Sequence, residues 1–315
     1  MSAVVTAAGF GGPEVLTVTD EPTPSPGPGQ VRIEVRAAGV NPIDFKSYSG
    51  AFGSDPADLP KRVGQEAAGV VTAVGPDAIG PGRTVSVGDE VIAYPARGAY
   101  AAELVVPASS TVPKPAQLGW AAAGGLLLTG ATAVHTLEAV GLRAGETVLV
   151  HGGSGGVGLF AVQLAAARGA TVIATASPAR HDMLREFGAH PVAYGEGLAD
   201  RVRAAAPGGV DAAIDLVGTD EAVDVSLELV ADRQRIATIA AFGRAHEADI
   251  KLLGGGPGAD PGNDIRAAAR EQLTAAAVDG SLRIVVAKTY PLEQAADAHR
   301  EIMTGHTTGK IVLVR

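Results

Sequence analysis

Residues Thr147 to Ser177 read TVLVHGGSGGVGLFAVQLAAARGATVIATAS, and this stretch decides the fold of the chain. A short apolar run, Thr147–Val150, leads into a glycine cluster, an amphipathic helix and a second apolar run over Ala170–Ala176. Such short runs of β-formers, bounded by glycine, are typical of strands buried on both faces of a parallel sheet. The order strand, glycine loop, helix, strand predicts a βαβ unit.

The glycine cluster satisfies the pattern G-x-G-x-x-G with Gly153, Gly155 and Gly158, directly after a strand and at the start of a helix. We expect Gly153 to permit the sharp turn, Gly155 to let a pyrophosphate approach the backbone, and Gly158 to let the helix pack on the strand. The helix N-terminus would direct free N–H groups at the phosphates. The predicted dinucleotide contacts are Gly153, Ser154, Gly155, Gly156, Val157 and Gly158.

The residues after the second strand indicate which dinucleotide binds. An NAD site usually has Asp or Glu there to hold the ribose hydroxyls, whereas this chain has Ser177-Pro178-Ala179-Arg180. Ser177 can donate a hydrogen bond and Arg180 can pair with a 2′-phosphate, which favours NADPH. In a purely structural interpretation, Ser177 caps the next helix with Pro178 at its first position.

A rival hypothesis comes from Gly152–Gly156, which also matches the G-x-S-x-G nucleophile elbow of serine hydrolases. Ser154 would then be the nucleophile, with residues such as Asp215 and His299 to complete a triad. Gly158, the Ser177/Arg180 pair and a long β-rich segment upstream fit only the dinucleotide hypothesis, which we therefore favour.

Composition excludes several classes of function. The chain has 315 residues, enough for two domains, and 25 basic against 34 acidic residues give a net charge of −9. This charge disfavours nucleic acid or an anionic membrane as partner. There is no cysteine, which excludes disulfides and thiolate chemistry. No signal-like N-terminus and no run of 18 apolar residues is present, so we expect a soluble cytoplasmic protein.

The pattern of secondary-structure signals in the chain changes near residue 118. Before it, short β-like runs broken by Gly and Pro predict a partly open barrel, at Gln30–Ala38, Ala67–Val74, Asp89–Tyr94 and Ala101–Val106. After it, strands and helices alternate as in a doubly wound sheet, with strands at Pro191–Tyr194, Val210–Leu216 and Arg235–Ala240 and helices at Ala199–Ala206 and Asp220–Ala231. Arg244–Gly262 is predicted to be a long loop, followed by Asn263–Val278 (helix), Arg283–Ala287 (strand), Glu293–Met303 (helix) and Lys310–Val314 (strand).

Six motifs in order resemble the medium-chain dehydrogenase/reductase superfamily, in its zinc-free quinone oxidoreductase branch, which includes zeta-crystallin and plant enone oxidoreductases. They are AAGVNPIDFK at Ala37–Lys46, GQEAAGVV at Gly64–Val71, GDEV at Gly88–Val91, LTGATA at Leu128–Ala133, the glycine fingerprint, and GHTTGKIVL at Gly305–Leu313. The resemblance implies an α/β protein with a GroES-like domain, residues 1–117 and 263–315, and a Rossmann domain, residues 118–262. It also implies a homodimer.

Zinc-dependent relatives carry Gly-His-Glu where this chain has Gly64-Gln65-Glu66. Glutamine replaces a ligand, and the seven histidines form no H-E-x-x-H pair, so we expect no metal. Without a Lewis acid, the favoured reaction is hydride transfer from NADPH to an already activated acceptor, a quinone or an α,β-unsaturated carbonyl. The protein would then be a quinone oxidoreductase or an enone reductase. An NADPH-binding protein with a structural or regulatory role is the alternative.

The resemblance also implies further site residues. Asn41, Lys46 and Tyr48 are candidate catalytic donors to the acceptor oxygen. Thr129, Phe242, Gly243 and Lys310 are candidate cofactor contacts. Each has a structural interpretation: Asn41 begins a turn with Pro42, Lys46 is solvated, Tyr48 lines a pocket, Thr129 bonds its own helix and Lys310 flanks a strand.

Overall fold

The computed structural model describes residues 1–315, which fold into two compact units. Unit 1 comprises Met1–Leu128 and Arg270–Arg315, and unit 2 comprises Thr129–Ala269. Both boundaries lie further along the chain than the sequence predicted. The first one shifts because helix α2 (Trp120–Gly124) packs against unit 1, where a Cβ on Gly124 would lie only 2.8 Å from the Cβ of Ala37.

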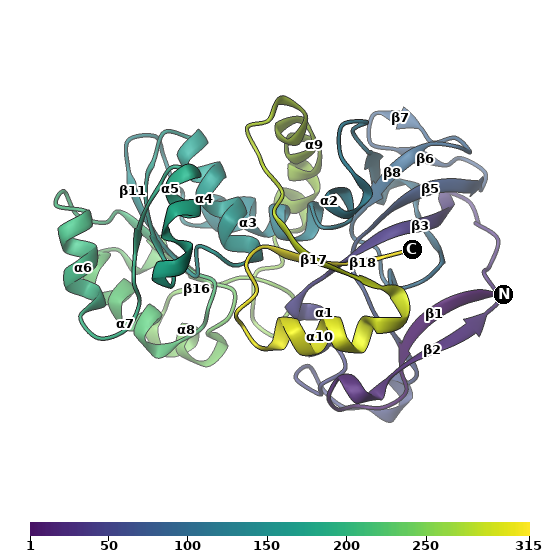
Figure 1. Ribbon diagram of the computed structural model, residues 1–315, viewed down its shortest axis with the longest axis horizontal. Helices are drawn as coiled ribbons and strands as arrows, with labels where there is room; N and C mark the ends of the chain where they lie inside the picture. The colour runs from purple at the N-terminus through teal and green to yellow at the C-terminus, as the bar shows by residue number, and fades with distance from the viewer. The chain divides into compact units, whose positions relative to one another are not determined.

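Unit 1 is built mainly from strands, as the short β-like runs broken by Gly and Pro predicted. Its strands are β1 (Ser2–Ala7), β2 (Leu16–Glu21), β3 (Gln30–Val40), β4 (Lys61–Arg62), β5 (Ala67–Val74), β6 (Ile79–Gly80), β7 (Arg83–Thr84), β8 (Glu90–Ala93), β9 (Glu103–Pro107), β10 (Thr111–Pro113), β17 (Val286–Pro291) and β18 (Lys310–Val314). The main sheet has the order β10-β8-β5-β3-β18-β17, and β9 also pairs with β3. The final strand therefore lies inside this sheet, between β3 and β17 (Figure 1).

Strand β3 shows why this sheet forms a core. Its residues alternate between half-buried and buried from Gln30 to Arg36, and the next four, Ala37–Val40, are all buried. The change follows from what covers the strand, since α2 packs on this end of β3 and β18 pairs with it, placing Ile311 opposite Val40. Helices α1 (Pro42–Lys46) and α10 (Ala295–Met303) complete this part of the unit.

Unit 2 is a doubly wound parallel sheet, which confirms the predicted fold class. Its strands are β11 (Thr147–His151), β12 (Thr171–Thr175), β13 (Ala189–Val192), β14 (Ala212–Asp215), β15 (Ile236–Thr238) and β16 (Lys251–Leu252), in the order β13-β12-β11-β14-β15-β16. The order reverses at β11, so the topological switch point lies between β11 and β14. Ligands of such folds bind at the carboxyl ends of these strands.

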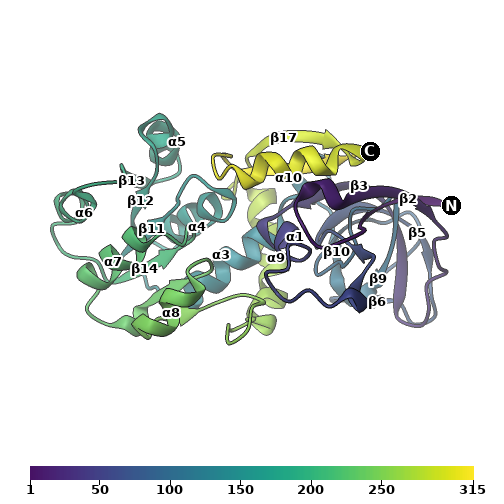
Figure 2. The same cartoon turned by 90° about the horizontal axis from the view of Figure 1, so that it is seen from below.

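Helices surround the sheet of unit 2. They are α3 (Leu127–Ala139), α4 (Gly156–Ala167), α5 (His181–Glu186), α6 (Leu198–Ala205), α7 (Asp220–Leu229) and α8 (Phe242–Ala248), while α9 (Asn263–Asp279) runs on into unit 1. Figure 2 shows α4 and α5 to one side of the strands and α7 and α8 to the other. This two-sided cover is why β11, β12 and β14 are buried along almost their whole length rather than at alternate residues.

The predicted long loop at Arg244–Gly262 is only partly a loop, because α8 and β16 occupy its first half. Helix α8 is tied to α7 by ion pairs, since Arg244 pairs with Asp220 and Asp224 of α7 at 2.6 Å each. Such contacts between distant segments leave no local helix signal in the sequence. The remaining loop is held by backbone bonds between Asp260 and both Leu252 and Gly254.

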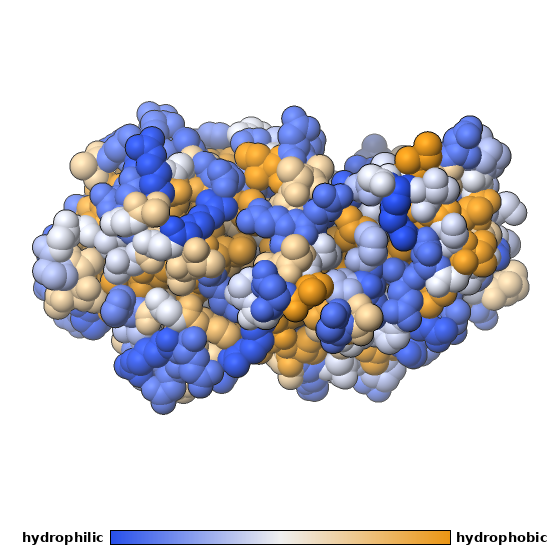
Figure 3. Space-filling model, turned by 90° about the horizontal axis from the view of Figure 1, so that it is seen from above, coloured by the Kyte–Doolittle hydropathy of each residue, from blue (hydrophilic) through white to orange (hydrophobic).

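No helix combines the length and the apolar character that a bilayer span requires. In the face drawn in Figure 3, apolar residues occur singly or in small groups among hydrophilic ones. Single exposed apolar side chains of this kind are normal on protein surfaces.

Candidate active site

The glycine loop turns at Gly152, not at Gly153 as predicted. Gly152 follows β11 with φ +77°, a left-handed conformation that favours glycine. Gly153 is needed for close packing, because a Cβ there would lie 2.8 Å from the Cβ of Ala174 on β12. A Cβ on Gly158 would lie 2.2 Å from the Gly152 carbonyl oxygen, so this glycine lets α4 approach the loop, where the sequence predicted close packing on the strand.

Gly155 stands at the N-cap of α4 and has open space in front of it. Its φ of −73° suits any residue, and an added Cβ would meet nothing closer than the Gly152 oxygen at 3.4 Å. The next residues, Gly156, Val157 and Gly158, form the first turn of α4, whose N–H groups have no partner within the helix. This arrangement offers donors and a positive dipole end to a phosphate.

Ser154 is not placed as a hydrolase nucleophile. A nucleophile elbow strains the backbone of its serine, but the only residues other than glycine with positive φ are Asp77 and Asp249. The proposed triad partners are engaged elsewhere. Asp215 accepts a hydrogen bond from Thr238, and His299 lies in unit 1 between two tyrosines. The hydrolase hypothesis therefore has no geometric support.

Ser177 and Arg180 follow β12, the parallel neighbour of β11, and so lie at the same edge of the sheet as the glycine loop. Ser177 is the N-cap of a short 3₁₀ helix, Pro178–Arg180, yet its hydroxyl makes no capping bond. Arg180 is exposed and its guanidinium has no partner within the protein. Both side chains are thus available to a ligand at this edge.

The other side of the switch point contains a residue that sequence reasoning named only as a triad partner. The carboxylate of Asp215, at the end of β14, accepts the backbone N–H groups of Val217 and Gly218 at 2.9 Å each, and the Thr238 hydroxyl at 2.7 Å. It fixes the loop that brings Val217 against Gly152. An apolar strand ending in Asp, followed by Gly, is the sequence signal for this loop.

Phe242 and Gly243 begin α8, just after β15, and so lie at the carboxyl end of the sheet as predicted. The ring of Phe242 lies against the loop residue Gly256, where a Cβ would approach it to 2.3 Å. Thr129 is buried, 3% exposed, in the first turn of α3. Its contact with a cofactor stays a prediction.

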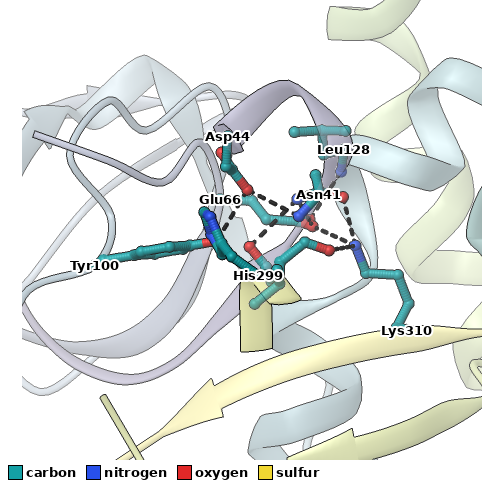
Figure 4. Close-up of polar contacts among 9 residues, drawn as sticks. Asn41, Asp44, Glu66, Tyr100, Leu128, His299 and Lys310 are labelled. Carbon is teal, nitrogen blue, oxygen red and sulfur yellow. Dashed lines mark hydrogen bonds and ion pairs between the residues drawn. The ribbon is translucent and has the colours of Figure 1, made fainter. Parts of the chain in front are cut away.

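In unit 1, Glu66 is the centre of a buried polar cluster (Figure 4). Its Oε1 accepts the side-chain N–H of Asn41 at 3.0 Å and the ammonium of Lys310 at 3.2 Å, and its Oε2 accepts the backbone N–H of Leu128 at 2.9 Å. The side chains of Glu66 and Lys310 are 0% and 2% exposed. Sequence reasoning quoted Glu66 in a motif but did not name it as a site residue.

Asn41 and Lys310, predicted to contact substrate and cofactor, have their N–H groups bound inside this cluster. The Asn41 amide has two N–H groups, and these bind Glu66 and the Gly39 carbonyl, so neither is left for an acceptor oxygen. The Lys310 ammonium donates to Glu66, to the Asn41 side-chain oxygen and to the Val40 carbonyl. Lys310 is therefore a buried ion-pair residue, contrary to the predicted contact with cofactor phosphates.

A second buried cluster holds α1 through its N3 residue, Asp44. One carboxylate oxygen of Asp44 accepts the Asn41 N–H at 2.8 Å and the Tyr100 hydroxyl at 3.0 Å. The Tyr100 oxygen lies 3.1 Å from His299 Nε2, and the Tyr48 hydroxyl lies 2.6 Å from His299 Nδ1. Because Tyr100 donates to Asp44, Nε2 carries the proton of a neutral His299, and Nδ1 accepts from Tyr48.

Burial governs the ionisation of this second cluster. It raises the pKa of Asp44 to about 7, against the lowering effects of the Asn41 N–H, the Tyr100 hydroxyl and the Lys310 charge. Burial also lowers the pKa of His299 to about 4 and raises the pKa of Tyr48. Tyr48 is fully buried and bonded to His299, so it presents no proton to a substrate, contrary to one of its predicted roles.

Lys46 differs from the other two candidate donors, because its side chain is only about half buried. Burial lowers the pKa of its ammonium. It lies in α1, a single turn whose N-cap is Asn41 and whose capping box includes Asp44. Both buried clusters therefore act on the helix that carries Lys46.

The side chains do not fit a zinc site. The chain contains no cysteine, and nowhere do three or more His, Asp or Glu side chains gather as metal ligands. Glu66, next to Gln65 in the motif where zinc relatives have His, has both oxygens hydrogen-bonded to Asn41, Lys310 and Leu128. No chemical step is therefore derived through a metal.

Comparison with known proteins agrees with this architecture. Residues 27–116 match the model of the alcohol dehydrogenase GroES-like domain, and residues 187–313 match that of the zinc-binding dehydrogenases. Mouse quinone oxidoreductase is 33% identical over 97% of this chain and 95% of its own length, and a Pseudomonas aeruginosa quinone oxidoreductase is 34% identical over the full length of both. A mycobacterial structure complexed with NADPH has a TM-score of 0.86 and 34% identity, with both chains fully covered. The chain thus belongs to the zeta-crystallin-like quinone oxidoreductase branch of the medium-chain dehydrogenase/reductase superfamily.

Proposed function

We propose that this protein is an NADPH-dependent oxidoreductase that transfers hydride to a quinone or an α,β-unsaturated carbonyl. One observation carries the proposal. Arg180 and Ser177, both without a protein partner, share one edge of the parallel sheet with the open N-terminus of α4. That edge offers two separate anion sites, as a pyrophosphate and a 2′-phosphate require. Full-length relatives named quinone oxidoreductase, and a similar structure complexed with NADPH, support it.

The cofactor contacts follow from this geometry. The first turn of α4, from Gly156 to Gly158, would hold the pyrophosphate, and Gly155 leaves room for its approach. Arg180 and Ser177 would hold the 2′-phosphate. When bound, NADPH supplies the hydride.

Lys46 is the residue that we propose to stabilise the acceptor. Hydride addition to an enone or quinone places negative charge on a carbonyl oxygen, which a positioned cation or donor stabilises. Asn41 and Tyr48 are buried, with their side-chain N–H and O–H groups bound inside unit 1, whereas Lys46 as a residue is only partly buried. Asn41 therefore has the role of holding α1.

The test is NADPH oxidation, followed at 340 nm, with 1,4-benzoquinone, 9,10-phenanthrenequinone and a simple enone in turn. We expect turnover with at least one of these acceptors, and lower kcat/KM with NADH than with NADPH. A higher kcat/KM for the enone would assign the enone reductase activity. Tight NADPH binding without turnover of any acceptor would instead support a binding protein with a structural or regulatory role.

We also propose that the protein is a homodimer, as the resemblance to its family implies. Light scattering on the purified protein should then give about twice the chain mass of 31.5 kDa. A mass near that of one chain would contradict this proposal and leave the catalytic one unaffected.

A further inference from the structure

Two segments that carry candidate site residues are bound to the same buried carboxylate. Glu66 accepts from the side chain of Asn41, the N-cap of α1, and from the backbone of Leu128, in the first turn of α3. We propose that Glu66 and its ion-pair partner Lys310 are positioning residues, which fix α1 with Lys46 and the first turn of α3. This inference rests on the proposed function, because that function assigns Lys46, on α1, its role at the acceptor oxygen.

The Asn41 amide can take only one orientation in this cluster. Its oxygen accepts from Lys310, and its nitrogen donates to Glu66 at 3.0 Å and to the Gly39 carbonyl at 3.2 Å. A flipped amide would face an ammonium with N–H groups and a carboxylate with an oxygen, so both contacts would become repulsive. The ion pair thus fixes the N-cap from which α1 starts.

Glu66 also satisfies a group that α3 cannot satisfy itself. The first N–H groups of a helix have no partner within it, and that of Leu128 is bound by Glu66 Oε2 at 2.9 Å. A carboxylate is favoured at this end of a helix by the helix dipole as well. The contact holds the turn in which Thr129 follows Leu128.

Glycines leave the space that this pair occupies. A Cβ on Gly39 would lie 2.2 Å from Glu66 Oε1, and a Cβ on Gly125 would lie 3.1 Å from Lys310 Cε. All three N–H groups of Lys310 have acceptors, and each oxygen of Glu66 has a donor. Because every polar atom of this buried pair has a partner, the positions of both side chains are fixed. Removing either partner leaves a buried charge unpaired.

The experiment compares Glu66→Gln, Lys310→Met and a matched control, Lys288→Met. Lys288 also pairs with a glutamate of unit 1, Glu301, at 2.8 Å, but at the surface. We expect both cluster variants to lower kcat with 1,4-benzoquinone at least tenfold, with KM for NADPH within threefold of the wild type. The control should change neither. Folded cluster variants with kcat within twofold of the wild type would overturn the proposal.

Amide hydrogen exchange separates failure of this inference from failure of the proposed function. In both cluster variants, exchange in peptides covering residues 41–46 and 127–131 should be at least tenfold faster, with residues 147–151 of β11 unchanged. This result would support positioning even if the wild type turned over no acceptor. Unchanged exchange in those peptides would contradict it.

If Lys310→Met does not fold, the isosteric Glu66→Gln variant alone can be tested by both steady-state kinetics and amide hydrogen exchange. A glutamine keeps the shape but must face one of the surrounding donors with its own N–H groups. A merely structural role predicts faster exchange throughout unit 1 and unchanged kcat well below the melting temperature. That pattern would also overturn the proposal.

Discussion

At the scale of single residues, Lys46 determines whether the proposed chemistry has a donor. Replacing it with methionine keeps the chain length and removes the charge, so we expect kcat to fall by roughly 100-fold with little change in KM. Burial lowers the pKa of the Lys46 ammonium from its usual value of 10.5. As pH rises, the wild-type rate should therefore begin to decline before pH 10.5 is reached. Steady-state kinetics against pH check both points. Unchanged turnover in Lys46→Met would instead support the structural interpretation, in which Lys46 is a solvated lysine without a catalytic role.

Arg180 tests the choice of cofactor at the same scale. Its guanidinium has no protein partner, so Arg180→Ala removes nothing from the fold. Losing a charge-assisted bond to the 2′-phosphate should raise KM for NADPH by about tenfold or more and leave KM for NADH unchanged. Arg185→Ala, which removes a nearby exposed arginine paired with Asp182, is the control. Equal effects on the two coenzymes would refute the phosphate role.

At the scale of elements, α1 depends on a carboxyl group whose ionisation the fold opposes. Burial raises the pKa of Asp44 to about 7, from an unfolded value of about 3.9. The folded chain therefore holds this proton more tightly, and the stability that it contributes at low pH is lost as pH rises from about 4 to about 7.

An asparagine at this position removes that pH dependence. Asp44→Asn should therefore gain about 2–3 kcal/mol of unfolding free energy relative to the wild type between pH 5 and pH 8. His299, whose pKa burial lowers to about 4, destabilises both proteins as pH falls below 6.5, so its effect cancels in the difference. Denaturant unfolding at both pH values measures the change. The exposed Asp58→Asn is the control, and a pH-independent difference for Asp44→Asn would contradict the prediction.

Gly155→Ala and Gly158→Ala should have different effects, the first on NADPH binding and the second on thermal stability. At Gly155 a Cβ meets nothing closer than 3.4 Å, so Gly155→Ala should keep the melting temperature and weaken NADPH binding at least tenfold. At Gly158 a Cβ would lie 2.2 Å from a carbonyl oxygen, so Gly158→Ala should lower the melting temperature by several degrees. Calorimetry and coenzyme titration distinguish the two. A Gly158→Ala protein as stable as the wild type would contradict this assignment.

Elements with a strong local pattern were predictable from the sequence, and contacts between distant segments were not. The strand at Ala67–Val74 has the predicted bounds, because a short run of β-formers that ends at Gly and Pro is a local signal. Glu66 and Lys310 lie 244 residues apart, and Tyr48 and His299 lie 251 apart, so no spacing rule joins them. The sequence therefore named Asn41, Tyr48 and Lys310 as candidate site residues but did not show that their side chains bind Glu66 or His299. The turn glycine was misplaced by one position because Gly152 and Gly153 are adjacent.

At the scale of the whole molecule, the two ends of the chain build one unit. Strand β18 pairs with both β3 and β17, so the last residues lie inside the sheet rather than at its edge. This insertion carries Lys310 to Glu66, and α10 carries His299 to Tyr48 and Tyr100. The candidate donor helix α1 is thus held by residues from the C-terminal segment. The residues that we propose to bind the coenzyme belong to the other unit, whose sheet order places them at one edge.

Coenzyme binding should therefore appear in the thermal stability of the whole protein. A ligand at 100 times its Kd stabilises the folded state by about 2.7 kcal/mol, and one at ten times its Kd by about 1.4 kcal/mol. If Arg180 gives NADPH a roughly tenfold advantage, then at 100 times the Kd of NADPH the melting temperature should rise about twice as much with NADPH as with NADH. In Arg180→Ala the two shifts should become equal. Differential scanning calorimetry measures all four values, and the absence of a shift with either coenzyme in the wild type would sink the proposed cofactor site.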